Sequence, residues 1–295
     1  GDGDLGSQAE AAGGLAKEAV TAEGKEERAL LAEARPPPRQ ASGNLPEADR
    51  LNNRNLEVQP EEILRAVLSV ERFCREQCEG STPDADTGNL AVELLVDEPT
   101  VRYCMCSNLD SPTVISVLSA AFEDIFIEDA IRALTCKEEL DLWNSAGEFK
   151  VLQEAREEDP RHEHIVHYTL KAPWPFWDRD VLQRRWRLRL PSENGCGEGC
   201  AVVMRSVSGD QPGAMREQEG VIRAFVYGAA FLLRPLHEGS AKGTQLTYLT
   251  QIDIGGLCPA WAQGLLMRMA SRGVVEWSVN LGAHCTSIRK RRLPS

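Results

Sequence analysis

The sequence predicts an α+β domain in which a long C-terminal helix covers a large antiparallel sheet. Three observations predict this fold. Nine segments have the β-branched or alternating composition of strands, and turn-like breaks separate them. The strands do not alternate with crossover helices, so a parallel sheet is not expected. The chain then closes with a strongly amphipathic segment, residues 259–284. Since a sheet with one apolar face needs a cover, this segment is the natural candidate.

Residues 1–57 are expected to form a disordered, low-complexity tail. Gly, Ala, Glu and Pro dominate this stretch, and it contains no aromatic residue. Such a segment buries too little apolar surface to offset the entropy lost on ordering. We therefore expect one ordered domain at residues 58–289, followed by a short basic tail at residues 290–295.

The domain is expected to open with a helix. Pro60 suits a first helical turn, and Glu61 and Glu62 suit the positive end of the helix dipole. Apolar residues recur at helical spacing from Ile63 to Cys74. Gly80 and the polar run that follows it end the pattern.

Strands and helices then alternate in blocks. Three strands are predicted first, at residues 91–96, 101–106 and 113–122. An amphipathic helix follows at residues 125–143. Six more strands are predicted at residues 149–154, 164–171, 181–190, 200–208, 221–233 and 244–254. Neighbours joined by short loops are expected to pair antiparallel.

The closing helix carries an apolar stripe. Trp261, Leu265, Met269, Gly273 and Trp277 repeat at intervals of four residues, which places them on one face. A helix of this length extends for about 39 Å. It is therefore long enough to cross the whole predicted sheet.

Composition excludes several classes of function. The 33 Lys and Arg residues are outnumbered by 45 Asp and Glu, giving a net charge of −12. This balance argues against nucleic-acid binding, which requires basic surface. Nine scattered Cys residues, an odd number, indicate a reducing, cytoplasmic environment. The most apolar stretch, residues 221–233, is too short to span a membrane.

Several local sequences resemble the START family of lipid-transfer domains over about residues 58–289. The strongest is YTLKAPWPFWDRDVLQRRWRL, residues 168–188, and the second is GVIRAFVYGAAFLLRPL, residues 220–236. Trp143, TYLTQIDIGG at residues 247–256 and PAWAQGLLMRMA at residues 259–270 are also typical of the family. These matches occur in the family's order, which makes the resemblance specific.

The resemblance implies a helix-grip fold, in which a curved antiparallel sheet wraps the C-terminal helix and encloses a lipid cavity. It implies a non-enzymatic protein without cofactors that binds one phospholipid, sterol or related lipid and transfers it between membranes. Its partners are then the lipid and, transiently, a membrane surface, so it is peripheral to membranes. Two alternatives stay open: a lipid sensor that signals through a protein partner of the N-terminal tail, and a helix-grip enzyme.

The resemblance also suggests lipid-binding residues. Arg185 corresponds to an inward arginine whose acidic partner is replaced here by Val166, so it either binds a lipid head group or faces solvent. Tyr168 and Tyr227 correspond to aromatics that hold choline in some members, or are ordinary sheet residues. Trp261, Leu265, Met269 and Trp277 are expected to contact lipid from the closing helix. Arg223 is expected to form a structural ion pair, with Asp180 or Glu219.

No metal site is predicted. His162 and His164 share one face of a strand, His167 points away, and the spacing suggests no fourth ligand. Cys104 with Cys106, and Cys196 with Cys200, do not form the paired CxxC pattern of a zinc site. The basic run Arg289 to Arg292 is either a solvated tail or a contact to anionic membrane.

Overall fold

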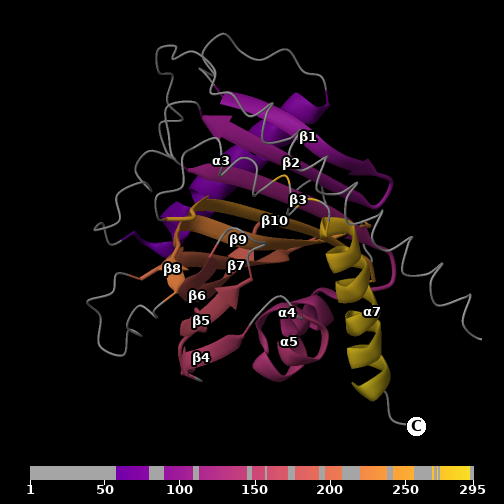
Figure 1. Cartoon of the computed structure of the whole chain (residues 1–295). Helices are drawn as coiled ribbons and strands as arrows, with labels where there is room; N and C mark the ends of the chain where they lie inside the picture. Colours follow the sequence, from indigo (N-terminus) through magenta and orange to yellow (C-terminus); the bar gives the residue numbers. More distant parts are fainter. Residues whose placement is uncertain are drawn as a thin grey trace, which may run out of the picture. The chain divides into compact units, whose positions relative to one another are not determined.

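The structure is a computed structural model that describes residues 58–79, 90–108, 113–144, 148–156, 158–171, 177–192, 197–207, 220–237, 242–255 and 273–292, with residues 268 and 271. All of them belong to one compact unit, Arg39–Ser295. The predicted tail at residues 1–57 lies outside the described residues. Within them the predicted α+β fold is confirmed: a wide antiparallel sheet carries helices on both faces (Figure 1).

Helix α3, Pro60–Cys78, opens the described chain as predicted. Pro60 occupies the first turn, where a missing N–H costs nothing, and Glu61 and Glu62 lie beside it. The face that repeats every three to four residues is buried, with Ile63 and Cys74 on it. This face packs on β7, β9 and β1.

Ten strands form one sheet among the described residues. They are β1 Leu90–Glu98, β2 Val101–Asn108, β3 Val114–Phe122, β4 Phe149–Gln153, β5 His164–Leu170, β6 Asp178–Leu190, β7 Gly199–Ser206, β8 Val221–Arg223, β9 Phe225–Pro235 and β10 Thr244–Asp253. The strand order across the sheet is β1-β2-β3-β10-β9-β7-β6-β5-β4, with β8 paired to β6. All pairs are antiparallel except the short β6–β8 pair, which is parallel.

The predicted strand at residues 221–233 is two strands, β8 and β9, interrupted at Ala224. The cause lies in an ion pair: Nε and Nη2 of Arg223 donate to the two carboxylate oxygens of Asp180, at 2.8 and 2.7 Å. The Ala224 N–H also donates to the Asp180 carbonyl oxygen at 2.9 Å. These contacts hold β8 beside β6, and they confirm the predicted structural ion pair of Arg223.

The predicted helix at residues 125–143 is also two elements, α4 Ile127–Thr135 and α5 Lys137–Trp143. Cys136 between them has the extended backbone angles φ −81° and ψ 125°. The hydroxyl of Thr135 donates to the Ile131 carbonyl at 2.8 Å, a contact that bends helices. The break lets each short helix bury its own apolar face.

Helix α7, Val274–Arg292, is the described part of the closing helix. The prediction ended this helix at about His284, but it continues for eight more residues. Arg289, Lys290, Arg291 and Arg292 form its last turn, where positive charge favours the helix dipole. None of the described helices is long and apolar enough to cross a membrane.

The core lies on both faces of the sheet. On one face, α3 covers a buried cluster that includes Trp186, Val203 and Leu232. On the other, α4 and α7 cover a second cluster that includes Met204 and Leu281. Figure 1 shows α4, α5 and α7 together on the face opposite α3. This second face contains the cavity described next.

Candidate functional site

A cavity of about 470 Å³ lies between the sheet and the layer formed by α4, α5 and α7. Its apolar lining comes from both layers. The sheet supplies Leu118, Met204, Phe231 and Ile252, and the helices supply Leu134, Leu140, Trp143, Val274 and Trp277. The Trp143 and Trp277 rings meet edge to face, with centroids 5.4 Å apart and planes at 61°. A hollow of this size and lining suits a hydrocarbon molecule.

One region of the cavity is polar. Arg185 and Gln183 project into it from β6, together with Tyr168 of β5 and Tyr248 and Thr250 of β10. Alternation along a strand places Arg185 and Gln183 on the same face. Nε of Arg185 donates to Oε1 of Gln183 at 2.9 Å. The sheet therefore concentrates its hydrogen-bonding groups around one charged side chain.

Arg185 is the only charged member of this group, and it is 6% exposed. Its guanidinium carbon lies 5.2 Å from the centroid of the Phe149 ring and 5.9 Å from that of Tyr168. Among the residues that the structure describes, no carboxylate forms an ion pair with it. Val166, at the position expected to hold an acid, is fully buried on β5. Arg185 thus keeps a charge in the cavity, and its neighbours in the described part of the chain are aromatic rings and an amide.

Burial shifts the pKa values of the groups around this charge. It lowers the pKa of Arg185 and raises the pKa of both Tyr168 and Tyr248. Burial also raises the pKa of Tyr103, at the β2 side of the cavity, to about 12. An arginine still holds its proton under such conditions, and the tyrosines stay neutral. The region therefore offers one positive charge and neutral hydroxyl groups to a ligand.

The rim of the cavity is partly exposed. Asp141, Asn144 and Glu148 line it beside Leu170, which ends β5. Leu142, next to the lining residue Trp143, is 67% exposed, and Trp177, next to the start of β6, is 62% exposed. Large apolar side chains rarely stay this exposed together unless a surface covers them.

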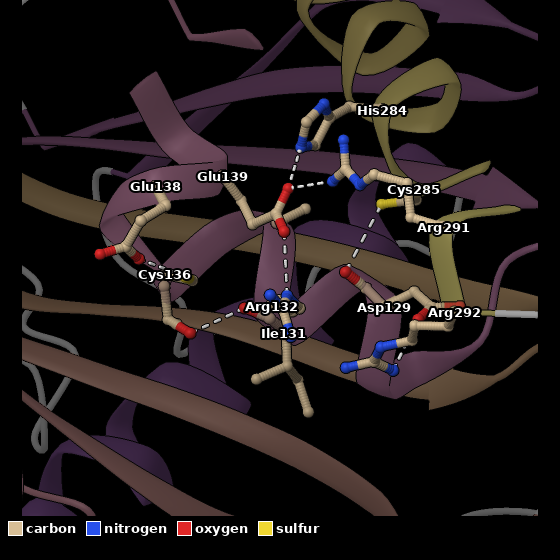
Figure 2. A network of polar contacts seen from close by, with 12 residues as sticks. Asp129, Ile131, Arg132, Cys136, Glu138, Glu139, His284, Cys285, Arg291 and Arg292 are labelled. Carbon is tan, nitrogen blue, oxygen red and sulfur yellow. Dashed lines mark hydrogen bonds and ion pairs between the residues drawn. The ribbon is translucent and has the colours of Figure 1, made fainter. Parts of the chain in front are cut away.

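A network of charges fastens α7 to the helices that wall the cavity (Figure 2). Glu139 of α5 accepts hydrogen bonds from Nε of Arg132, at 3.0 Å, and from Nη2 of Arg291, at 2.5 Å. Nε2 of His284 lies 2.9 Å from Oε2 of Glu139, the same carboxylate oxygen that Arg291 contacts. Burial alone would raise the pKa of Glu139, but these hydrogen bonds outweigh it and lower the pKa.

A second ion pair extends the network. Nη1 of Arg292 donates to Oδ1 of Asp129 in α4 at 3.0 Å, and Sγ of Cys285 donates to the Asp129 carbonyl (Figure 2). The guanidinium of Arg289 lies 4.2 Å from the centroid of the Phe126 ring. Three of the four basic residues predicted as a tail or a membrane contact therefore bind within the fold.

A larger depression, of about 560 Å³, lies near the start of α4 and is lined by Phe126, Glu128, Arg187, Arg189 and Glu198, among others. Its charges are paired: Arg187 with Glu128 at 2.7 Å, and Arg189 with Glu198 at 3.6 Å. Paired charges on an open surface are already well solvated. The cavity around Arg185 is therefore the better candidate for an apolar ligand.

The structure brings together three of the predicted lipid-binding residues: Tyr168, Arg185 and Trp277 all line the cavity. Trp261, Leu265 and Met269 lie outside the described residues. Arg185 faces the cavity and is buried, so the alternative that it faces solvent is excluded.

Tyr227 does not line the cavity. It lies in the cluster under α3, where its ring centroid is 4.9 Å from that of Phe225. Regular strand alternation, starting from the lining residue Phe231, would place Tyr227 in the cavity as well. However, the pairing of β9 with β10 shifts register between Gln251 and Ile252, and this bulge reverses the alternation. Tyr168 and Tyr227 therefore lie on opposite faces of the sheet, which favours the alternative that Tyr227 is an ordinary sheet residue.

Sequence reasoning missed several lining residues. Tyr248 and Thr250 lie two and four residues after Leu246 on β10, so all three face the same side of the sheet. Gln183 stands two residues before Arg185 on the same strand. Alternation along β6 points to Gln183 once the face of Arg185 is known, whereas Tyr248 and Thr250 also require the order of the strands across the sheet.

Comparison with known proteins agrees with this fold. A family model described as START domain matches residues 133–291. The mitochondrial steroidogenic acute regulatory protein of Gallus gallus is 30% identical over 145 residues, which are 49% of this chain and 46% of that protein. The match thus spans slightly less than half the length of this relative.

Two solved structures share the architecture. Human STARD10 superposes with a TM-score of 0.59 at 16% identity, covering 83% of this chain and 88% of that one. Human StAR-related lipid transfer protein 5 superposes with a TM-score of 0.52 at 12% identity, covering 76% and 98%. At these identities the likeness establishes the fold. With the family match over more than half of its length, this chain belongs to the START domain family.

Proposed function

We propose that this protein binds one lipid in the cavity and carries it between membranes without catalysing a reaction. The observation that carries the proposal is Arg185, a buried charge that projects into an otherwise apolar hollow. A buried arginine without an acidic partner is costly, and an oxygen-rich head group would remove that cost. Membership of the START family and similarity to a lipid transfer protein support the same function.

The chemistry of the cavity favours a lipid with a carboxylate or phosphate group. The guanidinium of Arg185 recognises either anion through paired hydrogen bonds, and the hydroxyl groups of Tyr168 and Tyr248 lie in the same region. The chain of the lipid would then lie along Leu118, Phe231 and Trp277. Each methylene removed from water contributes about 0.8 kcal/mol to binding.

Exchange with a membrane requires contact at the rim. We propose that Leu142, Leu170 and Trp177 insert into the bilayer surface, because all three are exposed. Leu170 lines the cavity, Leu142 directly precedes the lining residue Trp143, and Trp177 directly precedes β6, whose first residues pair with the end of β5. Trp suits the interface between water and hydrocarbon. The protein would then be peripheral to membranes only while it loads or releases its lipid.

The cavity favours lipid binding over an enzymatic role. Acid–base catalysis needs a titratable pair within reach of the substrate. In the described lining, the carboxylates Asp141 and Glu148 pair with Lys137 and Lys150, and no histidine lines this cavity.

Lipid extraction tests the proposal. The full chain is incubated with liposomes that contain phosphatidylcholine, phosphatidic acid, a free fatty acid and a sterol, then re-isolated. Bound lipid is identified by mass spectrometry, and transfer of the same lipid from donor to acceptor vesicles is followed. We expect one lipid type to be enriched and transferred. Protein that returns without lipid would contradict the proposal.

A further inference from the structure

Four cysteines meet between α3 and β2, on the face of the sheet opposite the cavity. Cys74 and Cys78 are four residues apart on α3, so both point to one side of the helix. Cys104 and Cys106 are two residues apart on β2, so both point to one face of the sheet. Cys74, Cys104 and Cys106 belong to the core cluster under α3, Cys78 packs against it, and all four are free thiols.

The thiols contact one another in a row. The Cys74 thiol hydrogen-bonds with those of Cys104 and Cys106, and the Cys78 thiol hydrogen-bonds with that of Cys104. The order is therefore Cys106, Cys74, Cys104, Cys78. A tetrahedral metal site would need the four sulfurs around one point. Within the described ranges, no group of three or more metal-binding side chains has such an arrangement.

The row runs from the interior toward solvent. Cys106 is fully buried, Cys74 is 1% exposed and Cys104 is 4% exposed, whereas Cys78 at the end of α3 is half-buried. A small oxidant thus reaches the row at Cys78. Cys104 is the thiol that Cys78 contacts, and it comes from a different element.

The thiols of Cys104 and Cys78 differ in pKa, and the difference favours Cys104 as the attacking thiol. Hydrogen bonds from Cys74, and to a smaller degree from Cys78, lower the pKa of Cys104 despite its burial. Burial raises the pKa of Cys78 to about 11. The thiolate is the attacking form in disulfide exchange. Cys104 is therefore equipped to attack a sulfur held at Cys78.

We propose that Cys78 and Cys104 are a redox modification site, at which a low-molecular-weight disulfide converts two thiols into a covalent link between α3 and β2. In the first and slower step Cys78, which solvent reaches but whose pKa is raised, loses its proton and attacks glutathione disulfide. One glutathione leaves as its thiolate and takes up that proton, and Cys78 carries a mixed disulfide. The Cys104 thiolate then attacks the Cys78 sulfur and releases the second glutathione, which takes up the proton from Cys104. The protein loses two electrons and two protons, and glutathione disulfide gains them.

The link is expected to stabilise the fold and to leave lipid binding unchanged. It closes the loop between residues 78 and 104, which restricts the unfolded chain. We expect the midpoint of thermal unfolding to rise by roughly 5–10 °C for a domain of this size. The cavity lies on the other face of the sheet, so this inference does not depend on the proposed lipid transfer.

The test uses the reduced full chain and glutathione disulfide as the probe. After oxidation, free thiols are alkylated and the protein is digested without reduction. We expect one cross-linked peptide pair that contains Cys78 and Cys104, its loss on adding dithiothreitol, and the predicted rise in unfolding midpoint. Lipid content before and after oxidation should be equal.

Two variants and a control complete the experiment. Cys78→Ser and, independently, Cys104→Ser should each abolish the cross-link and the thermal shift. Cys136→Ser should keep both, because Cys136 is also half-buried but its thiol donates to Glu138. Cys78 is at the half-exposed end of a helix, so its variant is expected to fold. Oxidation that stops at a glutathione adduct on Cys78, or that links Cys78 to another thiol, would overturn the proposal.

Discussion

Nε2 of His284 in α7 lies 2.9 Å from Oε2 of Glu139 in α5, although 145 residues separate them in sequence. The ring of His284 also stacks on Trp143, with centroids 6.3 Å apart. Trp143 in turn lines the cavity beside Trp277. The charges that fasten α7 and the aromatic wall of the cavity are therefore parts of one contact network, and disturbing the charges should loosen the wall.

Replacing Glu139 tests this connection. Glu139→Gln keeps the shape of the side chain but removes the charge that faces Arg132, Arg291 and His284. Because both arginines are about half exposed, solvent screens part of the loss. We expect the free energy of unfolding to fall by about 1–3 kcal/mol, measured by urea denaturation.

The control for this variant is Glu138→Gln, the neighbouring residue, whose carboxylate accepts a hydrogen bond from Cys136 on the exposed side. It should change the free energy of unfolding little. Equal stability of Glu139→Gln and the unchanged protein would show that these ion pairs do not hold α7.

Stability should also depend on pH. Burial alone would raise the pKa of Asp180, but hydrogen bonds from Arg223 and His167 outweigh it and lower the pKa, as happens at Glu139. Carboxylates with a lowered folded pKa stabilise the fold above their unfolded values, here 3.8 and 4.5. That contribution is lost as the pH falls through the lower folded values.

We therefore expect the free energy of unfolding to decline below about pH 4.5. Glu139→Gln should decline less steeply than the unchanged protein, because one of the two carboxylates is gone. Chemical denaturation at a series of pH values measures both curves. Parallel curves would exclude a lowered pKa at Glu139.

Arg185→Met is expected to reduce binding of anionic lipid by tenfold or more, which equals about 1.4 kcal/mol or above. The variant should be no less stable than the unchanged protein, since it replaces a buried charge, for which the described residues supply no carboxylate partner, with an apolar side chain of similar length. Lipid titration and thermal unfolding measure the two effects.

The matched control is Arg184→Met on the next position of β6. Alternation points Arg184 to the other face, where it lies 3.4 Å from Glu163, so lipid binding should be kept. Loss of stability in Arg185→Met without a change in lipid affinity would assign Arg185 a purely structural role.

The part of the cavity wall that α7 supplies is tested at Trp277. Trp277→Ala removes a cavity wall and its contact with Trp143, so we expect the bound lipid to dissociate several times faster. Val279→Ala changes the same helix at a residue that is 62% exposed and should leave release unchanged. Dissociation of a fluorescent lipid into acceptor vesicles measures the rates. Identical rates for the two variants would place the exit elsewhere.

Membrane contact is tested at the rim. Leu142→Ala together with Trp177→Ala should weaken binding to vesicles by about tenfold, because each apolar side chain inserted contributes a few kcal/mol at most. Leu94→Ala, at an exposed position of the edge strand β1, is the control. Co-sedimentation with vesicles measures binding. A stronger loss for the control would exclude the rim as the contact.

The sequence predicts the order of elements well because alternation and helical spacing are local signals. It predicts α3 and the strands, but it leaves open whether Arg185 or its neighbours on β6 face inward. It does not predict what long-range contacts decide. The bulge that turns Tyr227 away from the cavity and under α3 depends on pairing with β10. The break before β9 depends on Asp180 binding Arg223.

The extension of α7 beyond His284 has the same kind of cause. In sequence, Arg291 and Arg292 look like part of a solvated tail. The fold brings Glu139 and Asp129, over 150 residues earlier, beside them. Likewise, Cys74 and Cys104 show no metal or redox pattern in sequence. The fold creates their contact by packing α3 on the sheet, so that both residues join the core cluster beneath it.

Native mass spectrometry of the full chain, re-isolated from liposomes, tests the central claim most directly. The protein should carry one lipid per chain, and Arg185→Met should lose the anionic species while it keeps its fold. A protein that emerges at its bare mass from every lipid mixture, with a folded spectrum, would contradict the claim that the cavity holds a lipid.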